Sequence, residues 1–177
     1  SSKIDYNKSK CIVLNPGDFF NITTGKTSNS YIPIDLREKQ QYIDEILSKI
    51  KFDYENDPIP KTEELLLLLP KSYDRFERMR TKIGFVSDTK ILLVLSDEKF
   101  VSISCKGEGY EIINNKKIQE LSKYMIFSVD QRLLKRALLG PKFAHWNNVE
   151  LGSHIWHKKV PNNYERGLYY CLNFFYS

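Results

Sequence analysis

The spacing of apolar residues changes from helical in the first half of the chain to alternating in the second half. Over residues 35–52 the apolar positions recur every three or four residues, which predicts a helix. Asp35 and Glu38 stand where the two residues of a capping box would begin it. The apolar positions are Leu36, Tyr42, Ile43, Ile46, Leu47 and Ile50.

Two further helices are expected after this one. Thr62 suits the N-cap of a helix, and Pro70 is expected to interrupt it. Residues 71–82 then repeat the helical spacing, and Gly84 closes this mainly helical part. The arginines between 71 and 82 are expected to form a solvated face rather than a phosphate site. Before these helices, residues 10–14 are expected to form a short strand that ends in a turn at 15–18, and 21–34 an irregular loop. The chain is therefore divided into an N-terminal strand, loop and helical segment over 1–84 and a second domain over 85–177.

The second domain is expected to be built on a sheet. Residues 90–96, 99–105 and 110–114 are β-branched runs separated by turn residues, which is typical of an antiparallel meander. Further strands are expected at 123–128 and 149–158, with a short helix between them from Asp130 to Gly140, and a last helix from Pro161. These elements predict an α+β fold, an antiparallel sheet of about five strands with helices on one face.

Composition excludes several classes of protein. The 177 residues are 41% hydrophobic and carry a net charge of +5 that is scattered along the chain, so nucleic-acid binding is not expected. The longest apolar run, 65–69, is too short to cross a membrane. The three cysteines, Cys11, Cys105 and Cys171, are too widely spaced for a disulfide framework or a metal site. We therefore expect a cytoplasmic protein with no cofactor and no membrane partner.

The C-terminal block contains the candidate site. Trp146, Asn147 and Asn148 form an expected corner that is either a packed anchor or the wall of a small-ligand pocket. If 149–158 is a strand, Glu150, His154 and Trp156 share one face and His157 the other. One face then offers too few ligands for zinc, so no metal site is expected. Tyr170 completes the set of candidate ligand or interface residues, and no catalytic residue is assigned.

Two resemblances follow from these segments. Residues 85–159 resemble the sterol-carrier-protein-2-like fold, because the stretch IFSVDQRLLKRALLG follows several strands and precedes one more. The segment CIVLNPGD at 11–18 is similar to the closing strand and turn of a metallo-β-lactamase-type hydrolase domain. HWNNVELGSHI, with Val160-Pro161-Asn162-Asn163-Tyr164 after it, resembles the C-terminal extension of some hydrolases of that superfamily. The His-x-His-x-Asp-His metal cluster of those hydrolases is absent from these residues.

The resemblance implies a non-catalytic accessory or oligomerisation domain of a larger hydrolase, with a hydrolase domain in the same or a larger chain as its partner, or a second copy in a homodimer. Two alternatives remain open. One is a small domain that binds an apolar, lipid-like molecule, and the other is a stand-alone enzyme that uses Glu150 and His154 as acid and base.

Overall fold

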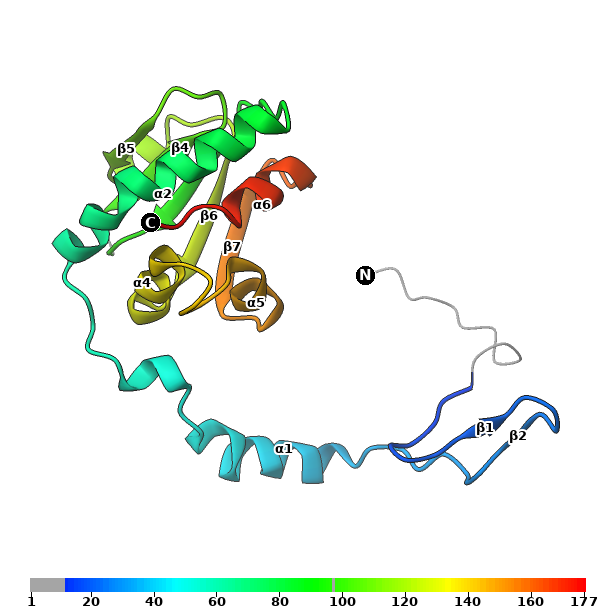
Figure 1. Cartoon of the computed structure of the whole chain (residues 1–177). Helices are drawn as coiled ribbons and strands as arrows, with labels where there is room; N and C mark the ends of the chain where they lie inside the picture. The colour runs from blue at the N-terminus through cyan, green and yellow to red at the C-terminus, as the bar shows by residue number, and fades with distance from the viewer. Residues whose placement is uncertain (1–11, 97) are drawn as a thin grey trace. The chain divides into compact units, whose positions relative to one another are not determined.

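The structure is a computed structural model that describes residues 12–96 and 98–177. The chain forms two compact units, Ser1–Lys51 and Phe52–Ser177 (Figure 1). The sequence-based boundary at residue 84 falls inside the second unit. The long helix before it, α2 (Thr62–Lys82), packs against helices α4 (Gln131–Leu139) and α6 (Arg166–Leu172) of the sheet-bearing part.

The first unit holds a small hairpin and one helix. Strands β1, Phe20–Asn21, and β2, Lys26–Thr27, pair antiparallel where an irregular loop was expected. Helix α1, Leu36–Glu45, begins at Asp35, whose carboxylate accepts a hydrogen bond from the Arg37 N–H at 2.8 Å. It is shorter than the predicted 35–52, since a 3-10 turn, η1 over Leu47–Lys49, replaces its end.

The predicted strand at residues 10–14 lies partly outside the described residues, and 12–14 are in no strand. The turn that follows them is firmly held. The carboxylate of Asp18 accepts hydrogen bonds from Asn15 Nδ2 at 2.9 Å, Ser28 Oγ at 3.0 Å and Asn29 Nδ2 at 2.6 Å. These bonds, led by that of Asn29, lower the pKa of Asp18.

The second unit is built on a five-stranded mixed sheet of order β5-β4-β3-β6-β7. Strands β3, β4 and β5 form the predicted antiparallel meander, and β6 pairs antiparallel with β7. The pairing of β3 with β6 is parallel, so the expectation of a purely antiparallel sheet was wrong. The strands are β3 Lys90–Val94, β4 Phe100–Ser104, β5 Tyr110–Ile113, β6 Tyr124–Val129 and β7 Ile155–Val160.

The position of β6 beside β3 follows from the burial of both faces of β6. Met125 and Phe127 are buried on one face, while Tyr124 and Ile126 pack against a second cluster on the other. A strand that is apolar on both faces suits the middle of a sheet. Strand β4 occupies one side of β3, so the other side of β3 is the central place left for β6.

Four helices of the second unit cover one face of the sheet (Figure 1). Phe76, Leu134, Trp146 and Leu168, one from each helix, meet Ile91, Val101 and Phe127 of the strands in the main core. Helix α3, Asn115–Ile118, contributes Ile118 to a smaller cluster on the opposite face. The covering helices are α2 Thr62–Lys82, α4 Gln131–Leu139, α5 Trp146–Leu151 and α6 Arg166–Leu172, and a 3-10 turn η2, Asp53–Asn56, precedes them.

Helix α2 runs unbroken through Pro70, so the predicted interruption there was wrong. A proline costs a helix the N–H that would reach the carbonyl four residues earlier, yet packing of the surrounding turns can outweigh that loss. Leu65 and Leu69 before the proline and Phe76 after it are all buried in the same core. The helix is thus held on both sides of the weak point.

The predicted strand at 149–158 was also wrong in its first half. Residues 146–151 form α5, in which Trp146 and Val149, three positions apart, are buried together. His145 caps this helix by accepting a hydrogen bond from the Asn147 N–H at 3.2 Å. Strand β7 starts only at Ile155, and α6 starts at Arg166 rather than near Pro161.

In the part of the chain that the structure describes, no helix has the length and apolar character needed to cross a bilayer.

Candidate functional site

The candidate residues of the C-terminal block do not form one site. Trp146 is only 3% exposed, and its Nε1–H donates to the Phe175 carbonyl at 2.9 Å, so it is a core residue. Asn147 and Asn148 are exposed in the first turn of α5. Trp156 is 82% exposed on the edge strand β7, and Tyr170 on α6 packs against Phe174 with 5.6 Å between ring centroids.

His154 is held by the segment that precedes α2. Its Nδ1 lies 3.3 Å from the Tyr54 hydroxyl, and its ring meets the edge of Phe52 at a centroid distance of 4.6 Å. Gly152 leaves the room that the imidazole occupies, because a β-carbon there would lie 2.7 Å from Cδ2 of His154. Among the described residues, Glu150 makes no contact with His154 that would couple them as acid and base.

Burial, followed by the charges of Asp130 and Glu55, raises the pKa of Tyr54. The phenol therefore stays protonated at neutral pH, and its hydroxyl lies within hydrogen-bond distance of Nδ1 of His154. This pair attaches residues 52–57 to the rest of the second unit.

The sequence reasoning missed the polar groups at the carboxyl end of the parallel strands β3 and β6. In sheets with parallel strands this is the edge at which ligands usually bind. Asp130 directly follows β6, accepts the Arg132 N–H at 2.9 Å and pairs with the Arg132 guanidinium at 2.7 Å. Gln131 donates to the carbonyl of Val94, the last residue of β3, at 3.1 Å, and its buried Oε1 has no hydrogen-bond partner among the described residues.

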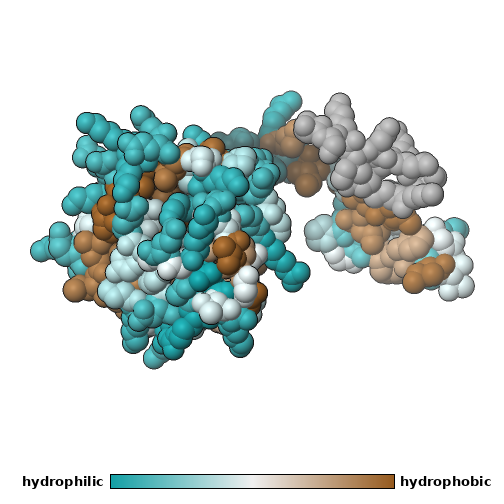
Figure 2. Space-filling model, turned by 90° about the horizontal axis from the view of Figure 1, so that it is seen from above, coloured by the Kyte–Doolittle hydropathy of each residue, from teal (hydrophilic) through white to brown (hydrophobic). Residues whose placement is uncertain are grey.

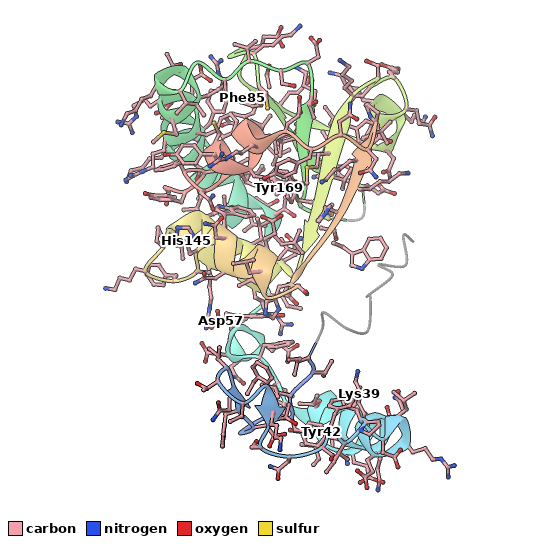
Figure 3. All side chains as sticks on the ribbon, turned by 90° about the vertical axis from the view of Figure 1, so that its right-hand side faces the viewer. Lys39, Tyr42, Asp57, Phe85, His145 and Tyr169 are labelled. Atoms are coloured by element: carbon pink, nitrogen blue, oxygen red, sulfur yellow. The ribbon has the colours of Figure 1, made fainter. Side chains whose placement is uncertain are left out.

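The polar face of α4 continues this edge. Arg136 makes two hydrogen bonds to the Asp57 carboxylate, at 2.5 and 2.9 Å, and one to Asp53 at 2.6 Å (Asp57 is labelled in Figure 3). The hydrogen bond from Arg136 lowers the pKa of Asp57. Lys135 makes one hydrogen-bonded ion pair with the Glu64 carboxylate, and this contact lowers the pKa of Glu64.

A cavity of about 490 Å³ lies beside these ion pairs, and Lys142 and Phe143 complete its lining. Lys135 and Arg136 are neutralised by carboxylates of residues 53–64, and Arg132 by Asp130. The arrangement therefore fastens residues 53–64 to α4, and a signal for it was present in the sequence as the basic residues at 132, 135 and 136.

No reactive thiol accompanies this edge in the described chain. Burial raises the pKa of Cys105 to about 12 and that of Cys171 to about 11, so both stay protonated at neutral pH. Both are buried and free, and Cys11 lies outside the described residues. Residues 12–96 and 98–177 contain no group of three or more His, Cys, Asp or Glu placed to hold a metal ion.

Comparison of the chain with protein-family models, with curated proteins and with solved structures found no match, so the likenesses described above depend on the quoted residues.

Proposed function

We propose that this chain supplies a non-catalytic accessory domain to a larger hydrolase of the metallo-β-lactamase type, and that its first unit is the part that binds the hydrolase domain. The single observation that carries the proposal is the apolar surface of that unit. The part of the first unit that the structure describes, 12–51, buries none of its residues. Figure 2 shows hydrophobic surface on this smaller unit.

The number of apolar side chains left exposed in the first unit is unusual for a piece of about this size. Soluble proteins seldom leave apolar surface of this extent uncovered unless a partner binds it. A unit this small also cannot supply a core of its own. The exposed side chains are Ile12, Val13, Leu14, Phe19, Ile22, Tyr31, Ile32, Ile34, Leu36, Tyr42, Ile46, Leu47 and Ile50.

The resemblance of residues 11–18 to the end of a metallo-β-lactamase-type domain indicates the partner of the first unit. Ile12, Val13 and Leu14 are β-prone and apolar, yet no described strand pairs with them. A single strand is unstable without a neighbour, so this run requires a sheet from elsewhere. The closing strand of a metallo-β-lactamase-type domain is such a place, and the hydrogen-bonded turn at Asn15–Asp18 would then lead the chain away from it.

The second unit fits a supporting role. The segment 52–64 binds Lys135 and Arg136 through its carboxylates, Arg132 through the Glu55 carbonyl and His154 through Tyr54. The order β6, Asp130, α4, Gly140 that supports the sterol-carrier-like resemblance is present, and that likeness remains part of the proposal. Two buried, unpaired thiols suit a reducing, cytoplasmic location.

The first test identifies the polypeptide that carries this sequence in its own cell. An antibody against the α4 segment captures it, and peptide mapping reads the rest of the same protein and its firm partners. We expect peptides that contain a His-x-His-x-Asp-His cluster. A protein of 20.8 kDa with no such domain in the chain or its complex would overturn the proposal.

The second test measures hydrogen exchange of residues 12–51 in the 177-residue chain and in the captured assembly. We expect fast exchange in the former and slow exchange in the latter. Leu14→Asp and Ile46→Asp should restore fast exchange to the assembly, whereas Thr24→Asp, an exposed polar position of the same unit, should not. Equal exchange in chain and assembly would count against this interface.

A further inference from the structure

The outward face of helix α2 carries a group of cations that the ion pairs of the second unit leave free. Arg75, Arg78 and Lys82 line a groove of about 240 Å³ together with Met79 and Phe174. Their spacing of three and four residues places them along one stripe of α2, about 10 Å from first to last. Several other lysines and arginines of this unit are matched by a carboxylate, as Arg136 is by Asp57.

None of these three cations has a carboxylate within ion-pair distance in the described chain. The Nε of Arg78 donates to the backbone carbonyl of Asp74 at 3.2 Å, which leaves its terminal nitrogens open to the groove. Glu77, the nearest glutamate along α2, is bound by Arg80 instead. The groove therefore has an unbalanced positive charge.

Arg75 provides the second and more specific observation. Its guanidinium lies over the Tyr176 ring, 4.7 Å from the centroid, so the side chain is fixed in place. Its Nε is buried and has no acceptor among the described residues. A buried donor without a partner is destabilising, and an ion or ligand that brings an acceptor close to it is one way to relieve this.

Solvation explains part of this arrangement but not all of it. Exposed lysines and arginines are usually hydrated, and Lys82 also stabilises the negative end of the α2 dipole. The Nε of Arg75 is closed to bulk water, however, and any acceptor, whether of water or of a ligand, reaches it only when the side chain shifts. The groove also has an apolar wall, formed by Met79 and Phe174, and hydration of the cations does not explain that wall.

We propose that this groove binds a phosphate ester, with the phosphoryl oxygens on Arg75, Arg78 and Lys82 and the organic part against Met79 and Phe174. Guanidinium groups match the geometry of phosphate oxygens and bind them with charge-assisted hydrogen bonds. An aromatic ring beside them favours a planar organic group, as in a nucleotide. Both a free nucleotide and a polynucleotide carry this chemistry.

The test follows the Nε–Hε resonances of arginine in the ¹⁵N spectrum of the full chain. The probes are inorganic phosphate, adenosine monophosphate and a short single-stranded oligonucleotide, each added at constant ionic strength. We expect a saturable shift of the Arg75 resonance, with tighter binding of adenosine monophosphate than of phosphate. Tightest binding of the oligonucleotide would assign the ligand to a polynucleotide, and tightest binding of the mononucleotide to a free nucleotide.

Matched variants separate this site from general charge attraction. Arg78→Gln/Lys82→Gln should weaken binding of adenosine monophosphate about tenfold or more, since each removes a charge-assisted contact. Lys99→Gln/Lys116→Gln removes the same charge from exposed positions elsewhere and should change it little. No saturable shift at Arg75, or an equal loss in both double variants, would overturn the site. Equal affinity for inorganic phosphate and adenosine monophosphate would overturn the role of Met79 and Phe174.

Discussion

Gly167, in the first turn of α6, lies directly against the ring of Phe85 (Phe85 is labelled in Figure 3). A β-carbon at position 167 would come closer to this ring than real β-carbons approach any atom. We therefore expect Gly167→Ala to lower the free energy of unfolding by about 1–3 kcal/mol, the usual cost of overpacking. Urea unfolding followed by circular dichroism measures it.

A companion variant tests the cause. Adding Phe85→Leu to Gly167→Ala makes room for the methyl group, so the double variant should lose less than the sum of the two single losses. A strictly additive result would mean that Phe85 is not what excludes a side chain from position 167.

Arg80 is buried, which the sequence did not predict for any arginine of 71–82. It was expected on a solvated face, but it is 8% exposed, and this expectation was wrong. Glu77 binds its guanidinium at 2.6 and 2.7 Å, and the Phe85 carbonyl accepts from it at 2.8 Å. Gly107 is required beside it, since its φ is +86° and a β-carbon there would lie 2.7 Å from Nη2 of Arg80.

This pair makes stability depend on pH. The hydrogen bond from Arg80 holds the pKa of Glu77 below its ordinary value of 4.5. A carboxyl with a lowered pKa in the folded state stabilises the fold above its unfolded pKa and loses this contribution as the pH falls through the folded one. Glu77→Gln should therefore cost about 1–3 kcal/mol near pH 7 and progressively less below about pH 4.5.

Urea unfolding of the wild type and of Glu77→Gln across pH 3 to 7 checks this. Glu120→Gln, at an exposed position after α3, is the control and should leave the curve unchanged. Parallel curves for wild type and Glu77→Gln would show that Glu77 contributes nothing through its charge.

At the scale of elements, helix α2 gives the sharpest test. The structure keeps it continuous through the exposed Pro70, so the proline is tolerated rather than required. Pro70→Ala restores a donor for the Leu66 carbonyl and should raise the free energy of unfolding by about 1–3 kcal/mol, as helix propensities imply. A loss of stability, measured by urea unfolding, would instead show that the proline sets the course of α2 over the sheet.

Local signals explain which elements could be predicted. The meander over β3–β5 and helix α4 between Asp130 and Gly140 each have their turn and cap residues next to them in the sequence, and both are present. The parallel partner of β3 could not be read in this way. The chain returns to it about thirty residues later, and only the burial of both faces of β6 decides it.

The candidate site was less predictable for a related reason. The first half of α5 was taken for a corner and its second half for the start of a strand, because a run of only six residues fits either period. The partner of His154 is Tyr54, one hundred positions earlier, and no spacing in the sequence indicates that contact. Pairings over such distances depend on the packed layers, not on the pattern of neighbouring residues.

At the scale of the molecule, the two units should differ in resistance to proteases. Residues 12–51 bury nothing among themselves, whereas the second unit has a continuous core. We expect brief trypsin digestion to cut after Lys49 or Lys51 and to leave a resistant fragment that starts near Phe52, as mass spectrometry would read. Cuts within α2 at the same rate would contradict the unit boundary at residue 52.

The two buried thiols make the transient opening of the second unit measurable. Cys105 follows β4 and Cys171 lies in α6, so the sheet and the helical layer each carry one. A thiol reagent can reach them only in molecules that have transiently opened, and its rate then follows the opening equilibrium. In a Cys11→Ser chain, equal rates at the two positions would mean that sheet and helices open together. A faster rate at Cys171 would show α6 detaching first, which would make the C-terminal helix the weakest part of the fold.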